Sequence, residues 1–352
     1  MKRMFLRMAA RVFSSCNRPG LGRSRGRAAW GIPAAVALWL ALFCVAALAG
    51  GFGTARRDGA WWLTMPGGGV PFFSIGADTT NGGDKRTRDR GYYWENNYPD
   101  LAAWAADTQQ RLYAWGFNTR GGWSDPTTAM TLPLVPELDL GRLSRLHWFD
   151  PFAPDAQAIA TAKAREITAP FKDNPAVIGY FTDNEVGWWN APLFRWYLGN
   201  EWAVYTKRFL WRMIYDHYKG DWRRLLVDFV PGKDVSGFED LKKGRAELHL
   251  RPGGHGIALI ERFTAVCAGK YYELVYKALK AADPDRLVMG DRLPLYYNQD
   301  AVLASRGFLD VLSTNYNVDT PDGWVAPYYF DGLARLTNTP VLISEFFFAA
   351  NE

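Results

Sequence analysis

The chain has 352 residues, of which 48% are hydrophobic and 22% are charged. This composition is that of a globular protein and excludes disordered, collagenous and disulfide-stapled chains. The formal net charge of +5 comes from residues 1–27, which contain eight basic residues and no acidic one. The rest of the chain has 33 basic and 36 acidic residues, so it lacks the concentrated positive charge that phosphate binding needs. We therefore expect no nucleic-acid partner.

An uncharged segment follows the basic residues. Residues 28–55 contain no charged side chain and include AAVALWLALFCVAALAG, which is long enough to supply the roughly 20 apolar residues that span a bilayer. Basic residues before such a segment stay in the cytoplasm, so we expect the chain after Arg56 to be exported. Ala47–Ala49 has the form of a signal-peptidase site, whereas the long basic region favours a retained signal anchor. A protein held in the membrane by this helix and a protein secreted after cleavage near Ala49 both fit.

Metal and cofactor motifs are absent from the sequence. The exported part contains one cysteine, Cys267, and so cannot form an intramolecular disulfide. The four histidines show neither HExxH spacing nor a CxxC companion, so we expect no metal site. No GxGxxG motif follows the first predicted strand and no GxxxxGKS/T motif occurs, so we expect no cofactor either.

Beyond a glycine-rich junction at 67–69, short apolar runs alternate with longer helical patterns, which is typical of β/α units. Strands are predicted in chain order at 71–76, 116–119, 132–138, 176–182, 286–290, 310–315 and 340–344. Helices, each bounded by Pro, Gly, Asn or Asp, are predicted at 100–115, 154–171, 201–218, 256–282, 298–306 and 327–336. The stretch 186–285 is too long for a single connection, so we expect it to hold a helical insertion.

Two glutamates directly follow predicted strands. Glu185 ends the run AVIGYFTDNE, and Glu345 ends PVLISE. In a β/α barrel the carboxyl ends of the strands form the reactive edge, so glutamates from separate strands could face each other there. Such a pair suits cleavage of a glycosidic bond, in which one carboxyl group protonates the departing oxygen and the other attacks the anomeric carbon or activates water.

These motifs separate two folds that the hydrophobic pattern leaves open, a doubly wound sheet and a (β/α)8 TIM barrel. The sequence resembles the retaining glycoside hydrolases of clan A, in particular the agarase and β-galactosidase-like families. The resemblance lies in FTDNE at 181–185, ISEF at 343–346, GFNT at 116–119 with GGWSD at 121–125, and STNYN at 313–317. It implies an α/β fold of the TIM-barrel type over residues 60–352. Only seven residues follow Glu345, so we expect an incomplete, seven-stranded barrel and a longer parent protein.

The resemblance also implies roles for individual residues. Glu185 would be the general acid/base, and Glu345 the nucleophile that forms a covalent glycosyl-enzyme with net retention of configuration. Asn184 would bind the sugar 2-hydroxyl. Arg120 and Tyr316 are the expected donors that keep Glu345 ionised.

Aromatic residues in the predicted loops are candidates for sugar binding. Sixteen tryptophans are many for this length, and four of them fall in loops after strands: Trp123, Trp188, Trp189 and Trp324. A flat, rigid indole suits the face of a sugar ring. The favoured pair is Trp188 and Trp189, because they come three and four positions after the proposed acid. Asn315 is expected either to contact sugar or to cap a turn.

The sequence thus predicts an exported retaining β-glycoside hydrolase whose partner is a galactose-containing poly- or oligosaccharide of the agar type. One alternative stays open. A non-catalytic glycan-binding or cell-envelope scaffold protein could keep the same barrel and the same aromatic residues.

Overall fold

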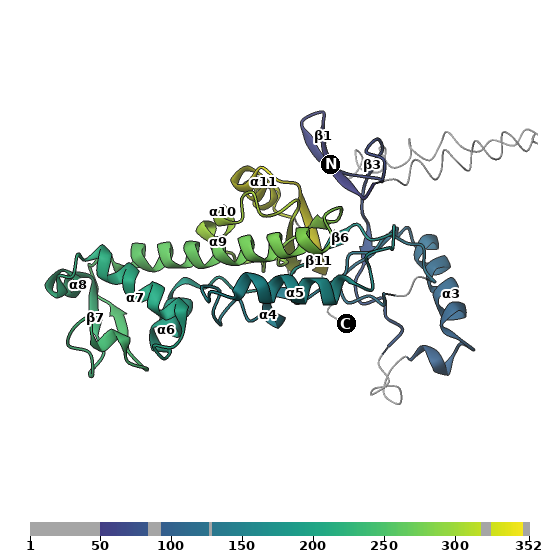
Figure 1. Ribbon diagram of the computed structural model, residues 1–352. Coiled ribbons are helices and arrows are strands. Elements are labelled where there is room, and N and C mark those ends of the chain that lie inside the picture. The colour runs from purple at the N-terminus through teal and green to yellow at the C-terminus, as the bar shows by residue number, and fades with distance from the viewer. Residues whose placement is uncertain (1–49, 84–92, 127–128, 318–324, 348–352) are drawn as a thin grey trace, which may run out of the picture. The chain divides into compact units, whose positions relative to one another are not determined.

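The computed structural model describes residues 50–83, 93–126, 129–317 and 325–347 (Figure 1). By internal contacts the chain divides into two units, 1–45 and 46–352, and the described residues all belong to the second. The predicted basic region and the predicted apolar helix up to residue 49 lie outside the described residues. Strand β1 (Gly53–Arg57) begins within the last three residues of the predicted 28–55 segment. No helix in the described ranges has the length and apolarity needed to cross a membrane.

A small antiparallel sheet precedes the β/α part of the chain. β1 pairs with β2 (Ala60–Thr64), and β2 pairs with β3 (Pro71–Phe72). The β1–β2 turn has φ of 51° at Asp58 and 80° at Gly59. These positive angles at both central residues are those of a type I′ hairpin turn, for which Asp-Gly is a preferred sequence. The hairpin was not among the predicted elements, and the strand predicted at 71–76 divides between this sheet and the next.

Parallel strands then follow one another in chain order. The pairs are β4 (Gly76–Ala77) with β5 (Thr119–Arg120), Arg120 with Leu134, Leu134 with Val177, β6 (Gly179–Tyr180) with β9 (Leu287–Val288), Leu293 with Thr314, and β10 (Leu312–Asn317) with β11 (Val341–Phe347). Each predicted strand contributes to this series, so the α/β class is confirmed. Among the described residues no strand pairs with the free edges of β4 and β11, and a closed TIM barrel is therefore not seen.

The helices agree closely with the sequence pattern. The six predicted helices are α3 (Leu101–Ala114), α5 (Ala156–Thr168), α7 (Tyr205–His217), α9 (Gly256–Ala282), α10 (Gln299–Ala304) and α11 (Pro327–Thr337). The elements that were not predicted are short: η2 (Trp94–Asn96), α4 (Leu140–Leu143), α6 (Asn190–Gly199), α8 (Trp222–Asp228), β7 (Phe229–Pro231), η3 (Asp240–Lys242) and β8 (Leu248–Leu250). Five of these, with α7 and α9, occupy the region where a helical insertion was expected.

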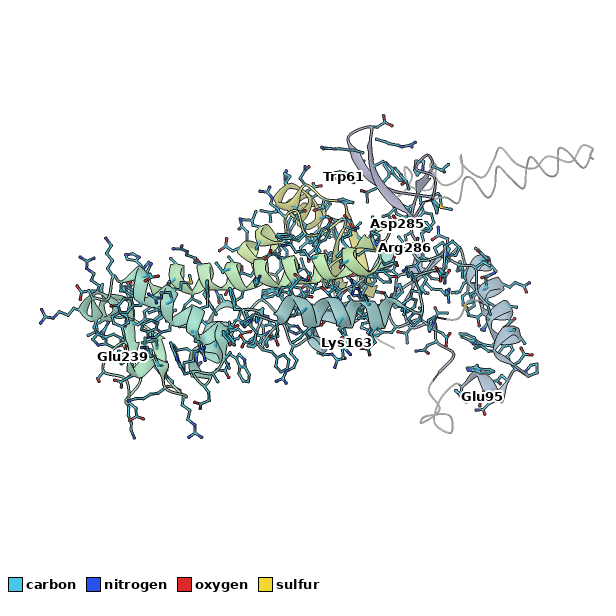
Figure 2. The ribbon with its side chains drawn as sticks, viewed as in Figure 1. Trp61, Glu95, Lys163, Glu239, Asp285 and Arg286 are labelled. Carbon is cyan, nitrogen blue, oxygen red and sulfur yellow. The ribbon has the colours of Figure 1, made fainter. Side chains whose placement is uncertain are left out.

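Helix α9 joins the insertion to the strands. It runs beside α5, and it also contacts α6 and α10 (Figure 1). Its first half packs Phe263 against Phe194 of α6, with ring centroids 6.1 Å apart. The second half carries two buried tyrosines, Tyr271 and Tyr272, toward the strand ends. Figure 2 shows Glu239, in the insertion, and Arg286, just beyond α9, near opposite ends of this helix. A helix of 27 residues therefore fixes the insertion and the strand ends in one core.

Candidate active site

Glu345 is directed by an irregularity in β11. Thr314 pairs with Ile343 but Asn315 pairs with Glu345, so Ser344 is an extra residue on β11. Such a β-bulge re-aims the side chains that follow it. The Ser344 hydroxyl donates to Oδ1 of Asn315 over 2.8 Å, and Oε1 of Glu345 accepts from Nδ2 of Asn317 over 2.9 Å. Glu345 therefore faces the residues at the end of β10.

Glu185 reaches the same place from β6. Its backbone has φ of 49°, in the left-handed region that non-glycine residues seldom occupy. The backbone N–H donates to the carbonyl of Asp291 over 2.9 Å, which holds the turn after β6 against the end of β9. Nδ2 of Asn315 donates to Oε1 of Glu185 over 3.0 Å and to Oδ1 of Asn184 over 3.2 Å. One buried asparagine thus contacts Glu185 with its side chain and pairs with Glu345 through its backbone.

A buried arginine that was not predicted is the cation of this site. The Arg292 side chain is fully buried, and its Nη2 donates to Glu345 over 3.1 Å, to Asp78 over 2.7 Å and to the Ser344 carbonyl over 3.2 Å. Its guanidinium carbon lies 4.1 Å from the centroid of the Trp123 ring. Arg292 follows β9 and Glu345 lies within β11, so the contact joins two different strand segments. A charged, bidentate-capable donor so placed favours the ionised form of Glu345.

Two more carboxylates surround Arg292. Asp78 follows β4, and burial raises its pKa while the charge of Arg292 opposes that rise. Glu137 lies in the third strand segment, where it pairs with Phe181; its side chain is 2% exposed and lies 3.7 Å from Nη1 of Arg292. Burial, only partly opposed by Arg292, raises the pKa of Glu137 to about 8. At neutral pH Glu137 is thus protonated, and the carboxyl groups that hydrogen-bond to Arg292 are those of Asp78 and Glu345.

The raised pKa of Glu137 predicts a pH-dependent stability. The folded state binds this proton up to about pH 8, whereas an unfolded glutamate releases it near pH 4.3, so the contribution of Glu137 to stability is lost as the pH rises through that interval. Glu137→Gln, which keeps the shape and cannot ionise, should lose about 3 kcal/mol less unfolding free energy than the wild type between pH 5 and 8.5. Urea unfolding at both pH values measures this; parallel losses in the two proteins would contradict it.

The glycines of the 121–125 motif are explained by close packing. A Cβ on Gly121 would lie 1.9 Å from Oδ1 of Asp78, and one on Gly122 would lie 3.0 Å from Nη1 of Arg292. The Gly122 N–H donates to Oδ1 of Asp78 over 2.8 Å. Only a backbone without side chains can approach the Asp78–Arg292 pair in this way.

The structure corrects the predicted partners of Glu345. Arg120 is buried, but its described bonds go to backbone carbonyls, the shortest being 2.8 Å to Asp125. It ties down the loop after β5. Tyr316 accepts a hydrogen bond from the N–H of Ala326, and its ring packs against Tyr329 and Phe330 of α11. Side chains alternate along a strand, so Tyr316 points to the helix side while its neighbours in β10 point to the glutamates.

The tryptophans predicted to bind sugar differ in their exposure and in their position relative to the site. Trp123 is 43% exposed and covers Arg292, so it lies at the site. Trp188 is 5% exposed, and its indole N–H is 3.2 Å from both the Tyr272 hydroxyl and Asp291. It is a core residue, and its proposed role as a sugar platform is wrong. Trp189 is 57% exposed on the turn after Glu185. Trp324 lies outside the described residues.

Two buried aspartates support the strand ends without facing substrate. Asp183 accepts from the N–H groups of Gly141 and Arg142 over 2.7 and 2.9 Å and from the Tyr271 hydroxyl over 2.6 Å. Burial raises the pKa of Asp183 to about 7 and that of Asp291 to about 6. Within the described ranges no group of three His, Cys, Asp or Glu side chains is arranged to hold a metal ion.

Comparison with known proteins shows which solved structures share this fold. The structure of PfGH50B has a similar fold: it matches with a TM-score of 0.67 at 19% identity, covering 85% of this chain and 53% of that one. An exo-β-agarase structure matches with a TM-score of 0.66 at 20% identity, covering 84% of this chain and 52% of that one. No protein-family model matches the chain.

More particularly, the chain is a homologue of a β-agarase. It is 26% identical over 282 residues to β-agarase A of Vibrio sp. (strain JT0107), an alignment that covers 70% of this chain and 27% of that protein. The agarase-like resemblance seen in the motifs is therefore confirmed. The chain spans about a quarter of the length of this curated relative and about half of the length of the two solved structures.

Proposed function

We propose that the protein is a retaining β-glycoside hydrolase that acts on an agar-type galactan. The observation that carries the proposal is the meeting of Glu185 and Glu345 around Asn315, although 160 positions separate them in the chain. Two carboxyl groups that converge from separate strand ends can act on one acetal from both sides. The similarity to proteins named as agarases supports galactan as the substrate.

In this mechanism the carboxylate of Glu345 attacks the anomeric carbon. The bond from that carbon to the glycosidic oxygen breaks, and Glu185 donates its proton to the departing oxygen. In the second step Glu185 takes a proton from water, the water oxygen bonds to the anomeric carbon, and the bond to Glu345 breaks. Each glutamate returns to its starting form, and the two inversions give net retention.

The surrounding donors support this division of roles. Arg292 and Asn317 both donate to the carboxylate of Glu345, which favours its ionised form as a nucleophile. Asn184 uses its Oδ1 to accept from Asn315. Its amide N–H groups are then available for a sugar 2-hydroxyl, a contact that strengthens in the transition state. Trp123 and Trp189, both exposed, are the proposed platforms for sugar rings beside the glutamates.

The test is hydrolysis of agar oligosaccharides by the full chain, with the configuration of the first-formed product followed by proton NMR. We expect products in the β configuration at early times, followed by slow equilibration to the α form. Early α products would contradict the retaining mechanism. Binding of the oligosaccharides with no turnover would favour the non-catalytic glycan-binding alternative instead. Export by way of the N-terminal region, which lies outside the described residues, stays a prediction from the sequence.

A further inference from the structure

A cavity lies at the insertion, lined by none of the carboxyl groups of the glutamate site. Its volume is about 580 Å³, and its walls come from the turn before α5, from α6 and from the segment before β8. Aromatic and polar side chains share the lining: Trp148, Trp196, Arg195, Asn200, Arg245 and Glu247. This volume and this mixture of flat apolar surface with a few polar groups are those of small-molecule binding sites.

The indole rings of the cavity are fixed in place. Trp196 donates its indole N–H to the backbone carbonyl of Trp148 over 2.8 Å, yet 51% of the residue is exposed. Trp148 in turn donates its indole N–H to the carbonyl of Val186 over 3.1 Å. Both polar edges are thus satisfied by backbone, which leaves the ring faces for an apolar partner. An exposed indole held in one orientation can stack a ring without losing side-chain freedom on binding.

The same rings connect this cavity to the proposed active site. The ring centroid of Trp148 lies 6.1 Å from that of Trp189 and 6.4 Å from that of Trp196, so the three side chains touch in series. Trp189 is four positions beyond Glu185. Val186, whose carbonyl accepts the indole N–H of Trp148, directly follows Glu185. The aromatic surface therefore begins at the acid/base turn and ends in the insertion cavity.

Polar groups at the rim fit a saccharide. Arg195 and Arg245 are exposed, and neither forms an ion pair with the described part of the chain. Arg245 has a left-handed φ of 62°, and its N–H donates to the carbonyl of Gly199 over 2.8 Å, which anchors this side of the rim to the end of α6. Planar guanidinium and amide groups beside a flat ring are donors for neighbouring hydroxyl groups of a sugar.

We propose that the insertion cavity is a distal binding site for the same galactan chain whose glycosidic bond is cleaved at Glu185 and Glu345. The proposal rests on the proposed function and extends it: a long chain contacts Trp189, Trp148 and Trp196 in turn, whereas a disaccharide occupies only the site at the glutamates. Affinity should therefore rise with chain length until the chain reaches Trp196.

The experiment uses the full chain carrying Glu345→Gln, so that bound oligosaccharides are not cleaved. Agar oligosaccharides of two, four, six and eight sugar units are titrated by calorimetry. Adding Trp196→Ala should weaken binding of the longest oligosaccharides about tenfold, which is the usual effect of losing one aromatic anchor. Binding of the disaccharide should change much less. Arg195→Ala, which removes an exposed side chain from the rim without disturbing the core, should weaken the same long oligosaccharides.

Trp115→Ala is the matched control, because Trp115 is 65% exposed and lies beyond α3, outside the cavity. It should bind every oligosaccharide as the parent protein does. Equal affinity of the Trp196→Ala and parent proteins for the longest oligosaccharide would overturn the distal site. A separate assay of turnover by the chain with its native Glu345 distinguishes this result from failure of the proposed function, in which no galactan is cleaved at any length.

Discussion

Glu345→Gln is expected to lower kcat/KM for agar oligosaccharides by about 10⁴-fold or more, because the amide cannot form the covalent intermediate. The substitution keeps the size of the side chain and one acceptor for Asn317 and Arg292, which both donate to Glu345. Thermal unfolding should therefore change little compared with activity. Reducing-sugar release from oligosaccharides measures the rate, and turnover equal to that of the wild type would refute the assignment of Glu345.

Glu185→Gln provides the contrast that separates the two roles. Loss of a general acid costs about 10²–10⁴-fold on a natural substrate, whose leaving group needs a proton. A nitrophenyl glycoside has a leaving group that departs without protonation, so the first step should be nearly normal and the intermediate should accumulate as a burst. Glu345→Gln should show no burst on either substrate. Identical behaviour of the two variants on both substrates would contradict the division between acid/base and nucleophile.

Elements with a strong local pattern could be predicted from the sequence. Helix α9 extends over Gly256–Ala282, the predicted range, because its apolar positions recur with the helical period over 27 residues. The strands were located by short apolar runs, and the polar residues that follow them mark the strand ends. This reasoning found Glu185 and Glu345, and it also applies to Asp78 and Arg292, which come after β4 and β9. It does not apply to Glu137, which lies within its strand segment.

Side-chain direction could not be predicted with the same success. Tyr316 is the predicted donor to Glu345, whereas in the structure the hydrogen bond to Glu345 comes from Asn317, one residue further along β10. A strand places successive residues on opposite faces, and the bulge at Ser344 shifts the register of β11 against β10. No local pattern reports such a shift. The shifted register puts Asn315 opposite Glu345, while its side-chain amide donates to Glu185.

The predictions for Arg120 and Trp188 differ from the structure because the sequence does not show how deeply, or against which groups, each side chain is buried. Arg120 and Arg292 are both arginines near strand ends, and a charge pattern does not distinguish them. Arg120 is surrounded by backbone carbonyls of its own loop, whereas Arg292 is surrounded by carboxylates from three other strand segments. Trp188 and Trp189 are adjacent in sequence and differ by more than half of their surface in exposure. Tertiary packing, which local sequence does not encode, determines which of each pair reaches the site.

Arg292→Met is expected to lower kcat/KM by about 10²–10³-fold, because the nucleophile loses its charged donor in a buried site. The unfolding free energy should also fall by about 3–5 kcal/mol, since the ionised carboxylates around Arg292 lose their cation. The diagnostic readout is the pH profile. Without the arginine the ionised carboxylates are less favoured, so the acidic limb of kcat/KM should move to higher pH. Arg292→Lys, which keeps the charge but not the planar fork, should restore stability more than activity.

Arg286→Met is the matched control, because Arg286 is also nearly buried but donates to the Asn174 carbonyl and to neither glutamate of the site. It should lower stability and leave the pH profile in place. If Arg292→Met and Arg286→Met shifted the pH profile equally, Arg292 would be a structural residue only, and the charge network around Glu345 would have no role in catalysis.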